Sequence, residues 1–315
     1  MKLDHVDNIA IVGTGMIGAS MAVMFSANRY RTKMLAVNEA EAAAGLARYD
    51  ENFRELVRKG LVTEKQASAC RKYLDVTLSY ADIFDADVIL ECVVEKLDVK
   101  HSVYEQIEAN CSGYKAIGSS TSAISADDLC KGLSAKEKLA VTHPYNPPHL
   151  VPCIEIVRGE HTDEQVITLL DNLFRSVGRA PVVMSKSAPG FVANRLQHAL
   201  SREAIYMVEQ GIATPEAIDK ALMTSFAPRY TSVGIFEHFD YAGLDMMRSV
   251  EDYVFPSLCT ADKAQDLLVD LCNSGDLGYK TGKGIHDWSK KDFNDFRRRS
   301  IEPYLKFFCC DIPDE

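Results

Sequence analysis

A histidine and a glutamate on either side of a proline-rich segment could form an acid–base pair. His143 follows the apolar run 139–141, and Glu155 stands inside a second run, 154–157, that is otherwise apolar. The four prolines between them favour an extended loop, so the pattern predicts a strand, a rigid loop and a second strand. If the second strand returns beside the first, Glu155 orients the imidazole of His143, which then acts as a general base near neutral pH. The alternative is a histidine that only ends a strand, without a catalytic role.

A glycine-rich turn near the N-terminus has the pattern that binds dinucleotides. An apolar run leads into it, and residues of helical character follow it. Gly13 permits the tight turn, Gly15 lets a pyrophosphate approach the backbone, and Gly18 allows the helix to pack closely on the strand. The first helical residues, Met16 and Ile17, then present free N–H groups to the anion. The alternative, a glycine-rich turn without a ligand, is weakened by the second strand-like run that comes next.

The residues after that second run indicate the cofactor. An acid usually binds the ribose hydroxyls about twenty positions beyond the last glycine, and this chain has Asn38 there, followed by Glu39. An asparagine also hydrogen-bonds a ribose, and Glu39 would repel a 2′-phosphate. Arg31 and Lys33 lie upstream and could attract such a phosphate. The balance favours NAD over NADP.

The order of strand and helix patterns predicts an α/β fold with a doubly wound, mostly parallel sheet of the Rossmann type. One stretch, 39–73, is charged and helix-forming with a break at Gly60. Its length predicts a helical hairpin that projects from the sheet. After Ser187 only helical patterns follow. We therefore expect an NAD-binding Rossmann-type domain over 1–187 and an all-helical C-terminal domain over 188–315.

Polar residues follow the predicted strands at one edge of this sheet. In open α/β sheets ligands bind beyond the carboxyl ends of the strands, so Glu95, Ser122 and His143 should line one site with the glycine turn. The hydroxyl cluster 119–122 has an alternative use. Its serines and threonine could cap the helix that begins near Asp127, a task that hydroxyl residues fill more often than catalysis.

Composition limits the classes of function and partner. The 315 residues are 47% hydrophobic, enough for a substantial core, and the net charge is −10. An acidic chain is a poor match for nucleic acid or an anionic membrane as the main partner. The nine cysteines form no CxxC pairs, so we expect neither a disulfide framework nor a metal site. The N-terminus lacks the apolar stretch of a signal peptide, which indicates a cytoplasmic protein.

Together these motifs resemble the L-3-hydroxyacyl-CoA dehydrogenase family over nearly the whole chain. They stand in the order and at the spacing of that family. Beyond the glycine turn, the matching motifs are Glu91-Cys92-Val93-Val94-Glu95 with Lys100, Ser120-Thr121-Ser122, His143 with Asn146-Pro147 and Glu155, Pro189-Gly190-Phe191-Val192-Ala193-Asn194-Arg195, and Gly278-Tyr279-Lys280-Thr281-Gly282-Lys283-Gly284.

The resemblance implies roles for the residues that would meet the substrate. His143 would be the general base, and Glu155 would orient it. Ser122 and Asn194 would hydrogen-bond the oxygens of the substrate. Nothing in the sequence around Asn194 indicates this role without the family.

The resemblance also implies contacts with the cofactor and with a second subunit. Glu95 and Lys100 would lie near the nicotinamide and its ribose, and Ser120 would belong to the same cofactor site. The family implies a homodimer, in which the apolar stripe on 191–208 would meet the helical domain of a second copy.

Three functions are open to such a protein. The hairpin and the motif 278–284 resemble the enzymes that interconvert short-chain L-3-hydroxyacyl-CoA and 3-ketoacyl-CoA, which is the first hypothesis. The segments 119–122 and 143–149 resemble the lambda-crystallin and gulonate 3-dehydrogenase branch and its pyridine-alcohol and carnitine-type relatives. Those relatives use small free hydroxy acids or alcohols. The third function is that of a catalytically silent, crystallin-like protein that binds nucleotide. The presence of the complete set of site residues argues against this third function.

The charges of the hairpin bear on this choice. A site for CoA should offer cations to its phosphates. The hairpin has such cations, but acids are interleaved with them and dilute the positive field. The cations are Arg48, Arg54, Arg58, Lys59 and Lys65, and the acids are Asp50, Glu51, Glu55 and Glu64.

Overall fold

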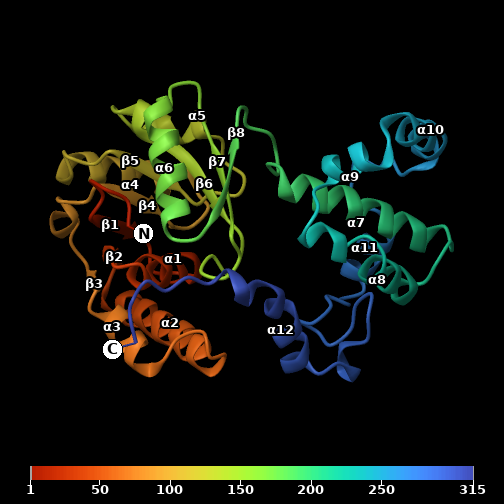
Figure 1. Ribbon diagram of the computed structural model, residues 1–315, viewed down its shortest axis with the longest axis horizontal. Helices are drawn as coiled ribbons and strands as arrows, with labels where there is room; N and C mark the ends of the chain where they lie inside the picture. The colour runs from red at the N-terminus through yellow and green to blue at the C-terminus, as the bar shows by residue number, and fades with distance from the viewer. Residues whose placement is uncertain (1, 315) are drawn as a thin grey trace. The chain divides into compact units, whose positions relative to one another are not determined.

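An eight-stranded sheet forms the centre of the first of the two units into which the chain divides (Figure 1). The computed structural model describes residues 2–314. The first unit runs to Val192 and takes up the chain again from Arg298, and the second unit is Ala193–Arg297. The first unit has an α/β architecture and the second is built from helices, which confirms the predicted fold class.

The sheet has the strand order β3-β2-β1-β4-β5-β6-β7-β8. Neighbouring strands run parallel except β6 and β7, which are antiparallel. The strand order reverses between β1 and β4, and a doubly wound sheet binds ligands at such a point, beyond the carboxyl ends of its strands. The strands are β1 (Asn8–Val12), β2 (Arg31–Leu35), β3 (Leu74–Thr77), β4 (Val88–Glu91), β5 (Ala116–Ser119), β6 (Leu139–Pro144), β7 (Cys153–Val157) and β8 (Ala180–Met184).

α-Helices flank the sheet in the first unit and form most of the second unit. In the first unit they are α1 (Met16–Ala27), α2 (Glu39–Arg58), α3 (Glu64–Arg71), α4 (Leu97–Asn110), α5 (Ala126–Leu129) and α6 (Glu164–Ser176). In the second unit they are α7 (Ala193–Glu209), α8 (Pro215–Thr224), α9 (Ile235–Ala242), α10 (Leu244–Val254) and α11 (Asp266–Asn273). The last helix, α12 (Phe293–Ile301), carries the chain out of the second unit.

β1 is apolar along most of its length because helices cover both faces of the sheet. Ile9 and Ile11 of β1 join one apolar cluster with residues of α1 and α6. Ala10 and Val12 join a second cluster with residues of α4. Successive side chains of a strand point to opposite faces, so a strand that is covered on both sides has no polar face to alternate with.

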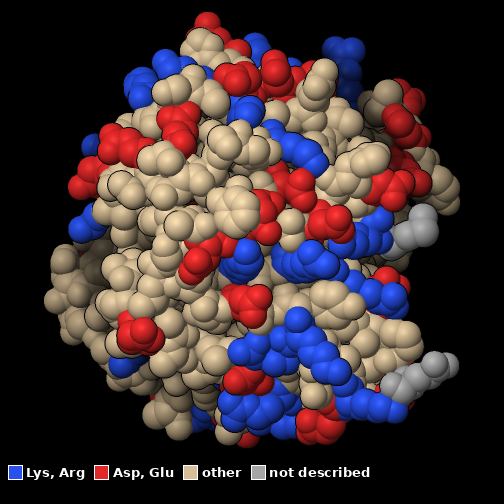
Figure 2. Space-filling model, turned by 90° about the vertical axis from the view of Figure 1, so that its left-hand side faces the viewer, with Lys and Arg blue, Asp and Glu red and all other residues tan. Residues whose placement is uncertain are grey.

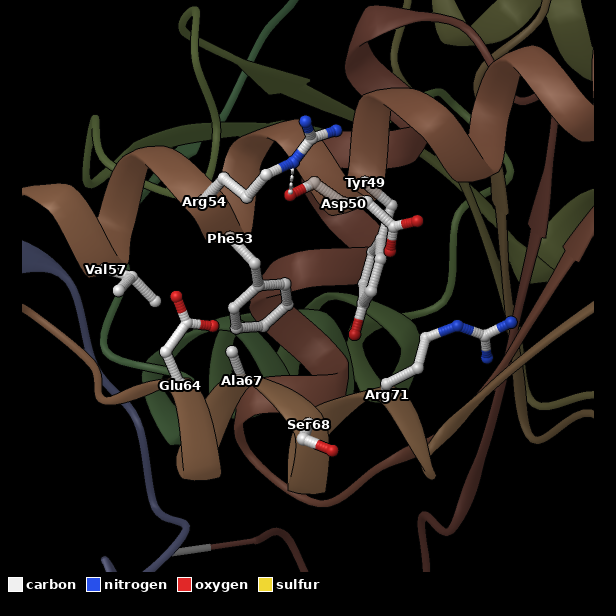
Figure 3. A pocket seen from close by; sticks show the side chains of 9 residues that line it. All are labelled: Tyr49, Asp50, Phe53, Arg54, Val57, Glu64, Ala67, Ser68 and Arg71. Carbon is white, nitrogen blue, oxygen red and sulfur yellow. Dashed lines mark hydrogen bonds between the residues drawn. The ribbon is translucent and has the colours of Figure 1, made fainter.

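The predicted helical hairpin is formed by α2 and α3. α2 ends before Gly60, whose backbone is left-handed with φ of 71°, and α3 begins with a capping box between Thr63 and Gln66. The hairpin lies against α1, where Tyr49 Oη is 2.9 Å from Ser26 Oγ. Figure 3 shows the space between the two helices, a cavity of about 330 Å³ with Tyr49 in its wall.

The chain after the helical unit, from Arg298 on, packs on the first unit. The sequence pattern instead predicts that the helical domain extends to 315. Ile312 is 7% exposed within the apolar core of the first unit. Asp311 N donates to Ala27 O at 2.9 Å. The reason is the set of apolar side chains that this charged segment also contains, since these residues contact the same core: Ile301, Tyr304, Leu305 and Phe308.

We expect Ile312→Ala to lower the free energy of unfolding by about 2 kcal/mol, because it leaves a cavity where a buried aliphatic side chain was. Urea denaturation followed by circular dichroism measures this change. Val37→Ala, at a side chain that is 85% exposed, is the control and should change the free energy by less than about 0.5 kcal/mol. Superimposable transitions for wild type and Ile312→Ala would contradict the packing described for this segment.

Candidate active site

β6 and β7 bring His143 and Glu155 together. The two strands are antiparallel and pair His143 directly with Glu155, so both side chains project from the same face of the sheet. His143 Nδ1 lies 2.8 Å from Glu155 Oε2. The predicted strand, loop and strand and the predicted contact between imidazole and carboxylate are both confirmed.

Glu155 fixes the tautomer of this imidazole. Its side chain is completely buried, and its other oxygen, Oε1, accepts the backbone N–H of Val192 at 2.8 Å. Because an ionised carboxylate only accepts hydrogen bonds, the ring proton of neutral His143 is assigned to Nδ1. Nε2 then carries the lone pair with which the ring can take a proton from a hydroxyl group.

Two aromatic side chains pack against the imidazole. The ring centroids of Tyr145 and Phe191 lie 5.1 Å and 5.3 Å from that of His143. Phe191 is buried and has a left-handed backbone with φ of 50°, which is rare outside glycine. The sequence assigned no role of its own to Phe191. Its unusual backbone in the turn before α7 is visible only in the structure.

The glycine turn has the backbone that its sequence predicts. Gly13 has φ of 109°, and a Cβ there would lie 2.5 Å from the carbonyl oxygen of Cys92, the residue after β4. A Cβ on Gly18 would lie 2.0 Å from Gly13 O, so only glycine permits this approach of helix and turn. No atom lies within 4 Å of a Cβ built on Gly15, where α1 begins with Met16 and Ile17. This open helix N-terminus fits a bound pyrophosphate.

Asn38 has a structural task at the cofactor edge. Its Oδ1 accepts the backbone N–H of Glu41 at 2.9 Å and so caps α2, which leaves its amide NH₂ group to donate to a ribose hydroxyl. Lys33, suggested above as a partner for a 2′-phosphate, instead binds Asp85 Oδ1 at 3.0 Å. Arg31 begins β2 and lies at the strand end remote from Asn38. The NAD-binding assignment therefore gains support over NADP.

A buried ion pair joins the carboxyl end of β4 to α4. Lys100 and Glu91 have completely buried side chains, and Lys100 Nζ lies 2.7 Å from Glu91 Oε1. Glu91 also accepts from Ser119 Oγ at 2.7 Å and from Tyr104 Oη at 3.0 Å. Lys100 Nζ is 3.4 Å from Glu95 Oε2. Lys100, expected at the cofactor, has no exposed surface in this structure and instead supports Glu95.

Glu95 is tied to the hydroxyl-rich loop that follows β5. Thr121 Oγ1 donates to Glu95 Oε1, and Ser122 N donates to the same oxygen at 3.1 Å. Partial burial raises the pKa of Glu95, but the hydrogen bond from Thr121 and the charge of Lys100 outweigh it and hold the pKa below its ordinary value. The half-exposed carboxylate is therefore ionised at neutral pH.

Some hydroxyl groups of this loop form hydrogen bonds within the loop or cap α5, and others remain exposed to solvent. Ser125 Oγ accepts the N–H of Asp128 at 3.1 Å and caps α5. Thr121 Oγ1 accepts the N–H of Ile124 at 2.9 Å as well as donating to Glu95. Ser122 is exposed and Ser120 is partly exposed. These two are the serines of the predicted site with surface left for a ligand.

Asn194 belongs to the second unit, unlike the other predicted site residues. It is the second residue of α7 and is partly buried. Its predicted contact with a substrate remains a prediction.

Two further features concern the part of the chain that the structure describes. None of the helices within 2–314 has the length and apolar character needed to cross a bilayer. The same residues contain no group of three or more histidine, cysteine, aspartate or glutamate side chains placed to hold a metal ion.

Two family models cover most of the chain. The model described as 3-hydroxyacyl-CoA dehydrogenase, NAD binding domain, matches residues 8–188. The model described as 3-hydroxyacyl-CoA dehydrogenase, C-terminal domain, matches residues 190–288. The two matches meet next to the turn that carries Phe191.

Individual relatives include enzymes named for different substrates. The L-carnitine dehydrogenase of Oceanobacillus iheyensis is 36% identical over 236 residues, which are 75% of this chain and 76% of the relative. The 5-formyl-3-hydroxy-2-methylpyridine 4-carboxylate 5-dehydrogenase of Mesorhizobium japonicum is 32% identical over 284 residues, or 88% and 89% of the two chains.

Solved structures show the same likeness. A crystal structure of a 5-formyl-3-hydroxy-2-methylpyridine 4-carboxylic acid 5-dehydrogenase, an NAD⁺-dependent dismutase, matches with a TM-score of 0.84 at 27% identity, covering 96% of this chain and 97% of that one. The (S)-3-hydroxybutyryl-CoA dehydrogenase of Ralstonia eutropha matches with a TM-score of 0.74 at 26% identity, covering 90% and 100%. The chain therefore belongs to the 3-hydroxyacyl-CoA dehydrogenase family of NAD-dependent oxidoreductases.

Proposed function

We propose that the protein oxidises the hydroxyl group of a small free hydroxy acid, with NAD as cofactor and His143 as general acid and base. The family consists of NAD-dependent dehydrogenases that act on hydroxyl groups. The observation that carries the proposal is the buried His143–Glu155 pair with its 2.8 Å contact at the carboxyl end of β6. A short-chain acyl-CoA substrate is the second candidate, because the (S)-3-hydroxybutyryl-CoA dehydrogenase shares the fold.

The residues divide the chemistry between them. Bound NAD⁺ supplies the hydride acceptor. His143 Nε2 takes the hydroxyl proton, and the buried carboxylate of Glu155 stabilises the imidazolium that forms and keeps the ring oriented. In the reverse direction protonated His143 returns that proton to the oxygen. Ser122 and Asn194 donate hydrogen bonds to the oxygens of the substrate, which holds the hydroxyl group near His143.

The charges on the hairpin support the free acid over the CoA ester. Glu51 pairs with both Arg54 and Arg58, at 3.1 Å and 2.7 Å. Arg48 Nη1 donates to the carbonyl of Thr14 in the glycine turn at 3.3 Å. Figure 2 shows basic side chains gathered in the lower half of the face that it displays, with acidic side chains among them. A CoA ester needs unopposed cations for its phosphates, and two relatives are named for small free molecules.

His143→Ala should lower kcat by about 10²–10⁴-fold, because it removes the proton acceptor. Glu155→Gln should lower kcat less, since an amide oxygen still accepts from Nδ1 but has no charge to stabilise the imidazolium. Initial rates at saturating substrate measure kcat, and titration of NADH fluorescence measures a cofactor Kd that should not change. His161→Ala, at an exposed histidine, is the control. Near-normal turnover by His143→Ala would contradict this mechanism.

Initial rates of NADH oxidation with free β-keto acids and with acetoacetyl-CoA, at matched concentration, distinguish the substrates. We expect turnover of a free acid that is indifferent to Arg54→Ala combined with Arg58→Ala, because both side chains already pair with Glu51. Saturable turnover of the thioester, weakened by that double substitution and by higher ionic strength, would favour the acyl-CoA reaction. Binding of NADH without turnover of any substrate in a broad panel would favour a catalytically silent role.

The helical unit exposes large apolar side chains, which supports a homodimer. They include Leu196 and Leu200, one turn apart on α7, Phe236 and Tyr241 on α9, and Tyr253 on α10. A large apolar patch is uncommon on a soluble monomer and typically marks an interface. We propose that a second copy of the chain covers it.

Sedimentation velocity at micromolar concentration should show a dimer. Leu196→Arg combined with Leu200→Arg should shift the protein towards monomer, because it places two cations in the apolar interface. Phe84→Arg, at an exposed apolar residue of the first unit, is the control. A wild-type protein that sediments as a monomer would remove the dimer from the proposal.

A further inference from the structure

A buried serine of α1 holds the loop that joins His143 to Glu155. Ser20 Oγ accepts the backbone N–H of His149 at 3.0 Å and lies 2.6 Å from Nδ1 of the same histidine. Ser20 is 1% exposed and His149 is 4% exposed. Nothing in the reaction described above uses either residue.

The hydroxyl group of Ser20 can donate one hydrogen bond to His149 and accept another from it. Burial, together with the charge of Arg179, lowers the pKa of His149 to about 4, so the ring is neutral at pH 7. Neutral Nδ1 can accept the hydroxyl proton of Ser20, while Ser20 Oγ accepts the backbone proton of His149. Alanine at position 20 would leave both groups of His149 buried and without this partner.

The same loop is held from a second direction. Arg179 is buried, and its Nη1 donates to Pro148 O at 3.1 Å. Its Nη2 donates to Phe307 O at 2.5 Å, in the chain segment that returns from the helical unit. Pro148 and His149 are therefore fixed between α1 on one side and Arg179 on the other.

Ser20 links this loop to the cofactor site. It stands two positions after Gly18, in the helix whose N-terminus faces the predicted pyrophosphate. At the start of the loop, Tyr145 packs its ring on the imidazole of His143. One short set of contacts thus runs from the cofactor helix through His149 and the loop to the general base.

We propose that Ser20 and His149 are positioning residues of the dehydrogenase reaction, which fix the loop so that His143 keeps its place relative to a cofactor held at α1. This inference rests on the proposed function. Misplacement of a catalytic group by about 1 Å can cost on the order of a hundredfold in rate. The hydrogen bonds between Ser20 of α1 and His149 of the loop after His143 prevent such a shift.

The test compares variants of equal burial. Ser20→Ala and His149→Phe should lower kcat by about ten- to a hundredfold with the NADH Kd unchanged, whereas His149→Asn, whose Oδ1 takes the place of Nδ1, should restore most of the rate. Ser26→Ala is the matched control, because Ser26 lies on the same helix, is completely buried and bonds Tyr49 instead of the loop. It should retain wild-type kcat although it also loses a buried hydrogen bond.

A second measurement separates this inference from the proposed function. In histidine-labelled protein, the ring resonances of His143, assigned with His143→Ala, should shift in Ser20→Ala and stay in place in Ser26→Ala. Unchanged His143 resonances in folded Ser20→Ala would overturn the positioning role, whether or not the protein turns over any substrate. An active wild type with unchanged kcat in Ser20→Ala, or equal losses in Ser20→Ala and Ser26→Ala, would also overturn it. An inactive wild type whose His143 resonances do respond would reject only the proposed function.

Discussion

The antiparallel pairing of β6 with β7 is the constraint on which the site depends. Successive residues of a strand face opposite sides of the sheet, so a shift of one position would turn Glu155 away from His143. The other strand pairs are parallel and need long crossover connections. The antiparallel pair β6 and β7 needs only a short loop, which lies next to His143 and Glu155. The same loop places Tyr145 on the imidazole and His149 on the cofactor helix.

A second buried carboxylate organises the cofactor edge as Glu155 organises the imidazole. Glu91, at the end of β4, receives hydrogen bonds from Lys100 of α4 and from Ser119 of β5. A buried charge is stable only when its partners are in place, so this group fixes two strands and a helix relative to one another. Lys100 extends that order to Glu95, which reaches the surface with an ionised carboxylate. Glu95 is thus positioned by Lys100, whose own side chain has no exposed surface.

What the sequence could predict depends on how local the physical cause is. The glycine turn and the pair His143 and Glu155 follow from patterns within a few residues of each, and the structure has both. The burial of Lys100 depends on how α4 packs beside Glu91 of β4, and the contact of Phe191 with the imidazole joins residues far apart in the chain. Asn38 illustrates an intermediate case. Its spacing from the glycine turn indicates a contact with the ribose, but its capping of α2 depends on where that helix begins, which the sequence does not fix to the residue.

The return of the chain to the first unit affects how the protein is made and how it can be rearranged. The helical unit, Ala193–Arg297, is an insertion between two parts of one folding unit. At common rates of translation the sheet leaves the ribosome roughly ten seconds before Ile312 does. During that interval the apolar surface that Ile312 covers is open to chaperones and to other nascent chains. A recombinant exchange of the helical unit would likewise need two junctions, near Val192 and Arg298, because a single crossover would discard the segment that completes the core.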